Sequence, residues 1–221
     1  MRRLNIKRVN EESTADMEHI DAILYINLAH RTDRKEHVIH EIHKICVDDA
    51  KIHRMDAIRT EPGALGCGLS HIKALEYAMA HPEWNTILIL EDDFTFHEDV
   101  ALLSALHTLL TCSPHMEIGL LSYNGSVLRY EDTSHSSIKR VLYSQTTSSY
   151  CIRSSYLPIL LQNMRESTMD MIIRGKTHEN CVDIHWTSLQ PQGHWYALFP
   201  AIGYQYDNYS DIEKRVTQYG C

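Results

Sequence analysis

Three features are absent from this sequence of 221 residues: a long apolar run, an export signal and an excess of positive charge. No apolar run approaches the roughly 18 residues that a membrane-spanning helix requires. The basic start at residues 1–8 is not followed by the apolar stretch of a secretory signal. A formal net charge of −8 argues against a nucleic-acid-binding surface. We therefore expect a cytoplasmic protein with no transmembrane segment and no nucleic-acid partner, and peripheral attachment to a membrane through a partner or a lipid-linked acceptor stays open.

Paired metal-binding cysteines and a phosphate-binding loop are also missing. The six cysteines include no Cys-x-x-Cys pair, and without an export signal we expect free thiols in a reducing compartment. The glycine-rich stretch at residues 62–68 lacks the Gly-Lys-Ser/Thr ending of a P-loop. We interpret this stretch as a turn in which Gly66 lets a loop pass close to a ligand, followed by a helix from about Ser70.

The remaining composition is that of an ordinary globular protein, with 43% apolar and 23% charged residues. Residues 1–19 are polar and predict a loosely ordered extension, whereas residues 20–221 suffice for one domain with a sizeable core. Apolar runs predict strands at residues 22–28, 51–55, 87–90, 117–122 and 195–200. Because helical patterns alternate with these strands, we expect an α/β fold with a doubly wound, mainly parallel sheet in a single domain.

The second half of the chain gives weaker signals. Short strands at residues 141–143 and 148–152 are candidates for a strand pair, and a helix is expected from Ser154 through Asn163. Small and polar residues predict a long surface loop at 122–137. Residues 166–180 predict a mobile segment.

The most informative stretch is Ile-Leu-Ile-Leu-Glu-Asp-Asp at residues 87–93. The apolar part predicts a strand buried on both faces, which places three acids at its carboxyl end, where open α/β sheets bind ligands. Clustered carboxylates repel one another unless a cation lies between them, and a divalent cation that also holds phosphates is the usual one. We expect Asp93, together with Glu91 or Asp92, to bind the ion. Alternation along a strand favours Glu91 and Asp93 on one side as the metal ligands, which leaves Asp92 for binding of the cofactor. The alternative is that these acids only cap the following loop or helix.

Four short motifs occur in an order and spacing that resemble glycosyltransferase family 25, which includes bacterial lipooligosaccharide and procollagen galactosyltransferases. The resemblance extends from residue 22 to about residue 213 and covers nearly the whole chain. The motifs are Tyr-Ile-Asn-Leu at 25–28 with Arg31, Asp33 and Arg34; Gly66-Cys67 with Leu69-Ser70-His71; Leu-Ile-Leu-Glu-Asp-Asp at 88–93; and, more weakly, Val182-Asp183 with Gln205 and Ser210-Asp211-Ile212.

This resemblance implies a GT-A fold, a UDP-sugar donor that is usually UDP-galactose, and Mn²⁺ at the acidic motif. The residues themselves suit Mn²⁺ or Mg²⁺ equally, because both prefer carboxylate oxygen. Family members of this type are inverting, which implies one carboxylate as general base. Asp183 matches the late acid of the family, and Asp170 is the second candidate. Residues 151–182 match the family poorly, so the resemblance says least about the acceptor. The acceptor it implies is a glycan, a lipooligosaccharide or a hydroxylated protein.

The nucleotide is expected at the end of the first strand, beside Asn27, Leu28, Arg31 and Arg34. A guanidinium such as that of Arg31 pairs well with phosphate, although a surface salt bridge to Asp33 or Glu36 is the alternative.

In the second motif, Gly66, Ser70 and His71 are expected on the donor side. The alternatives are a helix cap for Ser70, a core histidine for His71 and a small packing residue for Cys67. Two other classes of protein fit less well: a nucleotidyltransferase or phosphohydrolase, and a catalytically inactive homologue that binds a nucleotide sugar or glycan. Intact acids at 91–93 argue against the inactive homologue.

Overall fold

The computed structural model describes residues 19–98, 100–210 and 215–217. The extension expected at residues 1–19 therefore falls, apart from its last residue, outside the described residues, as do Asp211 and Ile212 of the fourth motif.

A mixed eight-stranded sheet forms the centre of the molecule, with strand order β2-β1-β3-β8-β5-β9-β7-β6. Parallel pairing joins β1 to both β2 and β3, and also joins β5 to β9, whereas β8 runs antiparallel between β3 and β5. Two small antiparallel strand pairs, β4–β10 and β11–β12, complete the described strands. The strands are β1 (Ala22–Asn27), β2 (Ile52–Asp56), β3 (Thr86–Glu91), β4 (Phe94–Phe96), β5 (Ile118–Leu120), β6 (Arg129–Asp132), β7 (Ile138–Tyr143), β8 (Ser149–Arg153), β9 (Trp195–Leu198), β10 (Gly203–Gln205), β11 (Asn208–Ser210) and β12 (Arg215–Thr217).

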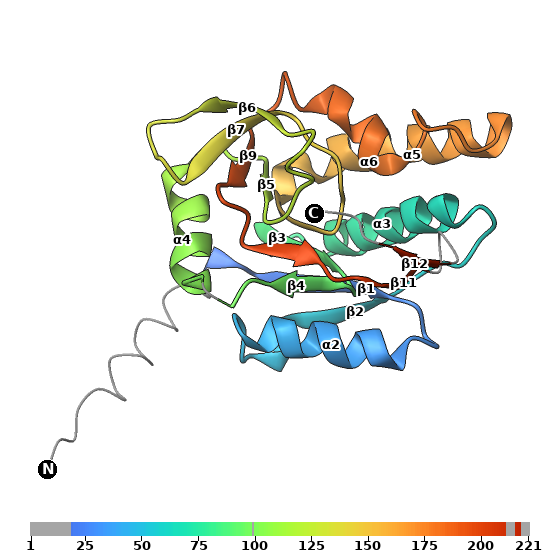
Figure 1. The fold of residues 1–221 in the computed structure, drawn as a ribbon, viewed down its shortest axis with the longest axis horizontal. Helices are drawn as coiled ribbons and strands as arrows, with labels where there is room; N and C mark the ends of the chain where they lie inside the picture. The colour runs from blue at the N-terminus through green and yellow to red at the C-terminus, as the bar shows by residue number, and fades with distance from the viewer. Residues whose placement is uncertain (1–18, 99, 211–214, 218–221) are drawn as a thin grey trace, which may run out of the picture.

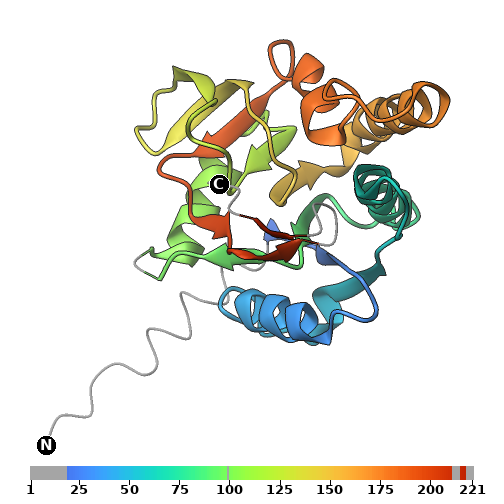
Figure 2. The same cartoon turned by 45° about the vertical axis from the view of Figure 1, so that its right-hand side comes forward.

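Helices cover both faces of this sheet, with α2 on one side and α3 and α5, which lie side by side, on the other (Figures 1 and 2). Alternating residues of β1 enter two separate apolar cores: Leu24 packs with α3 and α5, and Ile23 packs with α2 and α4. This explains why the central strands are continuously apolar. The helices are α2 (Thr32–His43), α3 (Gly63–Met79), α4 (Leu102–Cys112), α5 (Leu157–Arg174) and α6 (Val182–His185).

The predicted single-domain α/β class is confirmed, and four local predictions need correction. The glycine-rich stretch is not a turn, because α3 begins at Gly63. Helix α5 continues to Arg174, through much of the segment expected to be mobile. Strand β6 lies inside the expected loop at 122–137. Strands β7 and β8 do not pair with each other, because β5 and β9 lie between them in the sheet. No helix among the described residues is long and apolar enough to cross a membrane.

Close packing explains why a glycine is needed inside α3. A Cβ added to Gly66 would lie 2.3 Å from the Ile58 carbonyl oxygen and 3.1 Å from the Thr60 amide nitrogen. Both are backbone atoms, which cannot rotate away as a flexible side chain would. The absence of a side chain thus lets α3 pass directly against the loop at residues 57–60, which is part of the site described below.

Replacing Gly66 with alanine is expected to destabilise the protein by about 1–3 kcal/mol, as overpacking typically does. Urea unfolding measures this change. Gly125→Ala is the matched control, because a Cβ at Gly125 meets no atom within 4 Å. Equal stability of the two variants would contradict the close approach of α3 to this loop.

Candidate active site

The candidate site lies where β1 and β3 end together. These neighbouring parallel strands pair Ile26 with Glu91, so Asn27 and the acids at 91–93 are brought to one edge of the sheet. Asn27 donates from Nδ2 to Asp92 Oδ2 at 2.7 Å. The sequence-predicted first and third motifs therefore form one cluster.

Arg34 is the internal counter-ion of this cluster. It is only 9% exposed, and its Nη1 lies 3.0 Å from both Asp92 Oδ1 and Asp93 Oδ2. Burying a charge is costly unless a partner of opposite charge is present. Burial raises the pKa of the Asp92 carboxyl, although Arg34 and Asn27 oppose the shift. Arg34, expected to contact the nucleotide, thus holds two acids in place.

Glu91 receives hydrogen bonds from three separate segments. His71 Nε2 lies 3.2 Å and Thr147 Oγ1 2.7 Å from Glu91 Oε1, and Gln205 Nε2 lies 3.4 Å from Oε2. Burial acts to raise the pKa of Glu91, but the bonds from His71 and Thr147 outweigh it, and the pKa is lowered. Glu91 is therefore held as a carboxylate.

Asp93 has the most perturbed acid–base behaviour in the cluster. Burial, followed by the charge of Glu91, raises the pKa of Asp93 to about 7. Gln205 Nε2 donates to Asp93 Oδ1 at 3.1 Å as well as to Glu91, so this amide lies between the two carboxylates. Negative charge here exceeds what Arg34 neutralises. The donor set of Glu91 and Asp93, two carboxylates in need of positive charge, fits a hard divalent cation such as Mn²⁺ or Mg²⁺.

Two cavities flank this cluster and share Cys67, Glu91 and Gln205. The volumes are about 110 Å³ for the first and about 520 Å³ for the second. The first cavity is lined by the end of β1, the loop at 57–60, α3 and the acids, including Leu28, Arg31, Arg34, Arg59, Ser70, His71, Asp92 and Asp93. The second cavity is lined by Gln145, Thr146, Thr147, Lys176, Thr177, His178, Cys181 and Asp183, among others.

Arg31 and Ser70 reach the first cavity while making bonds within the protein. Arg31 forms an ion pair with Asp33 at 2.8 Å, which is the alternative considered from the sequence. Ser70 does not cap a helix, because it lies in the interior of α3. Its hydroxyl donates to the Gly66 carbonyl at 2.6 Å and accepts from the Ile58 amide at 2.8 Å. Gly66 and Ser70 thus position the loop at 57–60, and Ser70 also lines the first cavity.

Asp183 lies in the second cavity, in the first turn of α6. Burial and then the charge of Glu91 raise the pKa of Asp183, and a hydrogen bond from the Thr146 backbone opposes the shift. Thr146 has φ of 82°, an uncommon conformation for a β-branched residue that costs energy and often occurs at functional sites. Asp170 lines neither cavity. Its carboxylate accepts a hydrogen bond from Asn180 and forms an ion pair with Arg174.

Three site residues had no role assigned from the sequence. Gln205 appeared only in the weak fourth motif, and Thr147 and Arg59 gave no recognisable signal. Thr147 precedes β8, which pairs with β3, so it reaches Glu91 only through sheet topology. Arg59 projects from the loop that Gly66 and Ser70 hold.

Comparison with known proteins gives no family. No protein-family model matches the chain, and no curated protein matches it. Among solved structures, a mannose-1-phosphate geranyltransferase from Thermus thermophilus has 11% identity and a TM-score of 0.45, covering 85% of this chain and 63% of its own. A glycosyltransferase involved in glycosylation of the major capsid of PBCV-1 has 9% identity and a TM-score of 0.40, covering 81% of this chain and 93% of its own. A UDP-glucose pyrophosphorylase from acinetobacter baumanii has 9% identity and a TM-score of 0.46, covering 85% and 73%. Structural similarity with TM-scores and identities this low supports no conclusion about function.

The raised pKa of Asp93 predicts how stability depends on pH when metal is removed. In the folded state this carboxyl holds its proton up to about pH 7, against an ordinary value of 3.8. Folding therefore favours the protonated form, and the stabilisation is complete below the unfolded pKa and is lost as the pH rises through the folded pKa. For one group the slope approaches about 1.4 kcal/mol per pH unit.

Urea unfolding in the presence of a chelator, for wild type and Asp93→Asn, tests this dependence. Wild type is expected to lose more stability than the variant between about pH 5 and about pH 8. Parallel stability curves would show that Asp93 titrates normally.

Proposed function

We propose that this chain is a metal-dependent, inverting glycosyltransferase of the family 25 type, which moves a hexose from a UDP-sugar to a glycan or glycoconjugate. UDP-galactose is the first donor to test. The observation that best supports this proposal is the junction of two cavities at Glu91. One cavity contains the acids and the end of β1, where a nucleotide is expected, and the other contains Asp183.

The donor diphosphate is assigned to the first cavity, with the nucleoside extending past Leu28 toward solvent because the cavity is small. Glu91 and Asp93 would hold Mn²⁺ or Mg²⁺, which neutralises charge on a leaving diphosphate when bound. Asp92 turns toward Asn27 and Arg34 and keeps this edge of the site rigid. Arg59 and Arg31 line the same cavity and add positive charge, although Arg31 shares its charge with Asp33.

The acceptor is assigned to the larger cavity, whose volume lies within the range of small-molecule sites. Asp183 is the general base that takes the proton of the acceptor hydroxyl. Its raised pKa suits this role, because a base works best when its pKa approaches the working pH. Acceptor screening would determine whether a lipooligosaccharide, another glycan or a hydroxylated protein binds in this cavity.

Arg59→Ala is expected to raise KM for the donor about tenfold with little change in kcat, because a charge-assisted bond to the diphosphate would be lost in ground and transition states alike. Steady-state kinetics with varied donor measures this effect. Arg165→Ala serves as the control, since Arg165 pairs with Glu76 on the surface and lines neither cavity. An unchanged KM in Arg59→Ala would place the diphosphate elsewhere.

A UDP-release assay across a panel of UDP-sugars, with and without Mn²⁺ and with water as the only acceptor, tests the proposed function. Slow, metal-dependent release of UDP from one donor is expected. Release of UMP or pyrophosphate instead would identify a phosphohydrolase or nucleotidyltransferase. If no donor turns over, a thermal shift with UDP and Mn²⁺ would identify a binding homologue, and no shift would reject nucleotide binding.

A further inference from the structure

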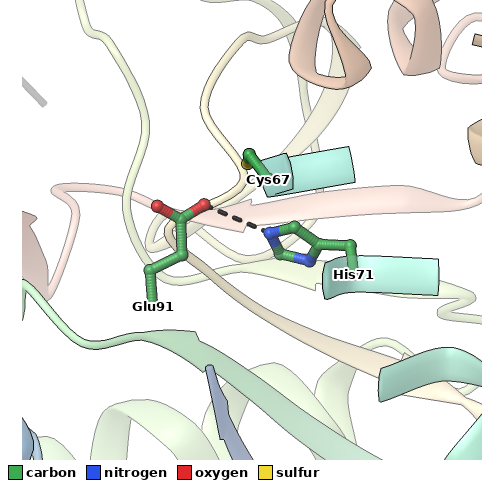
Figure 3. Close-up of side chains that lie close together, drawn as sticks. All are labelled: Cys67, His71 and Glu91. Atoms are coloured by element: carbon green, nitrogen blue, oxygen red, sulfur yellow. Dashed lines mark hydrogen bonds and ion pairs between the residues drawn. The ribbon is translucent and has the colours of Figure 1, made fainter. Parts of the chain in front are cut away.

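Three side chains of different chemistry, those of Cys67, His71 and Glu91, lie close together (Figure 3). Cys67 and Glu91 line both cavities, and His71 lines the first. Cys67 and His71 lie four residues apart on one face of α3, and Glu91 ends β3. Their ligand atoms all lie within 4.8 Å of one another. Across residues 19–98, 100–210 and 215–217, no other group of three histidine, cysteine or acidic side chains meets this condition.

The spacing of these atoms suits a tetrahedral metal. Bonds of about 2.0–2.3 Å from Zn²⁺ to nitrogen, oxygen and sulfur place neighbouring ligands roughly 3.3–3.7 Å apart. His71 Nε2 and Glu91 Oε1 are already 3.2 Å apart. Cys67 Sγ lies within 4.8 Å of the ligand atoms of His71 and Glu91, so a small movement of this side chain would complete the set.

Outer hydrogen bonds already orient two of the three groups. His71 Nδ1 lies 3.1 Å from the Tyr150 hydroxyl, which leaves Nε2 directed at Glu91. Thr147 Oγ1 donates to Glu91 Oε1 at 2.7 Å. Partners of this kind fix ring orientation and raise ligand basicity in protein zinc sites.

We propose that Cys67, His71 and Glu91 form a zinc site whose fourth position opens toward the cavities. A set of thiolate, imidazole and carboxylate favours Zn²⁺, whereas Mg²⁺ and Mn²⁺ prefer oxygen ligands such as Glu91 and Asp93. The sulfur–zinc bond forms as the thiol proton is released to solvent. The proposal involves no nucleotide, but it shares Glu91 with the carboxylate pair of the proposed function. The test therefore uses Cys67 and Asp93, each of which belongs to one of the two sets alone.

Cobalt spectroscopy of the metal-free full chain tests the site, because Co²⁺ substitutes for Zn²⁺ and reports thiolate ligation directly. One equivalent of Co²⁺ is expected to produce a thiolate-to-cobalt charge-transfer band that Zn²⁺ removes. Cys67→Ser should lose the band and weaken Zn²⁺ binding at least tenfold in a chelator competition, since even loss of an outer partner costs about that much. Cys112→Ser, at an exposed thiol outside the cluster, should keep it.

Asp93→Asn should also keep the band, which separates this site from the carboxylate pair. A band that persists in Cys67→Ser, or no band in wild type, would overturn the proposal. If Cys67→Ser does not fold, thiol alkylation of wild type followed by mass spectrometry decides the question. Zn²⁺ should protect Cys67 but leave Cys112 reactive, and equal alkylation of Cys67 with and without Zn²⁺ would also overturn it.

Discussion

Replacing Asp93 with alanine is expected to lower metal-dependent UDP release on the order of 10³-fold, because a cation that neutralises the leaving diphosphate contributes several kcal/mol to the transition state. The fold should persist, since Arg34 keeps its ion pair with Asp92 and Asn27 still donates to that carboxylate. UDP release with saturating Mn²⁺ is the measurement, and circular dichroism checks the fold.

Asp132→Ala is the control for loss of an acid. Asp132 is exposed, pairs with Lys139 between β6 and β7, and lines neither cavity, so its removal should leave UDP release unchanged. Retained activity in folded Asp93→Ala, with Mn²⁺ present, would reject Asp93 as a metal ligand.

Replacing Asp183 with asparagine is expected to lower kcat for transfer by about 10²–10⁴-fold, the usual contribution of a general base. The variant keeps the shape of the side chain but cannot accept the proton of an acceptor hydroxyl. UDP affinity should not change, because Asp183 lines only the second cavity. Transfer kinetics together with UDP binding separate the chemical step from donor recognition.

Asp170→Asn provides the matched comparison, since the sequence alone left Asp170 as the second candidate. Its carboxylate bonds Asn180 and Arg174 and faces neither cavity. We expect transfer within a few-fold of wild type. A large loss in Asp170→Asn combined with normal kcat in Asp183→Asn would reverse the assignment.

Sequence patterns predicted the centre of this molecule well because the signal was physical and local. A continuous apolar run predicts a strand covered on both faces, and Ile87, Leu88, Ile89 and Leu90 are all fully buried. Acids that directly follow such a run must lie at the end of the strand, so their position at the edge of the sheet could also be predicted.

Helices α3 and α5 show where local signals fail. Glycine disfavours a helix interior, yet Gly66 and Gly68 both lie inside α3. Neighbouring segments pack so closely against α3 at these two positions that they leave no space for a side chain. A Cβ at Gly68 would lie 2.6 Å from Thr168 Cγ2 of α5. The polar segment of α5 is likewise helical because Ser167 and Thr168 are buried against this packing. Tertiary contacts overrode propensity in both helices.

The partners of the acids could not be predicted for a similar reason. Gln205 bonds Asp93 across 112 positions of sequence, and Thr147 bonds Glu91 across 56. Only the folded topology brings these segments together. The buried role of Arg34 between two carboxylates was also hidden, because an arginine near a strand end suggests phosphate binding equally well from sequence.

Equilibrium binding of UDP, measured by calorimetry on wild type and Asp93→Ala with and without Mn²⁺, tests the central claim most directly. The claim is that the acids at the end of β3 hold a cation that in turn holds the donor diphosphate. We predict that Mn²⁺ tightens UDP binding at least tenfold in wild type and has no effect in the variant. UDP binding that is equally tight without Mn²⁺, or equally strengthened by Mn²⁺ in Asp93→Ala, would contradict the claim.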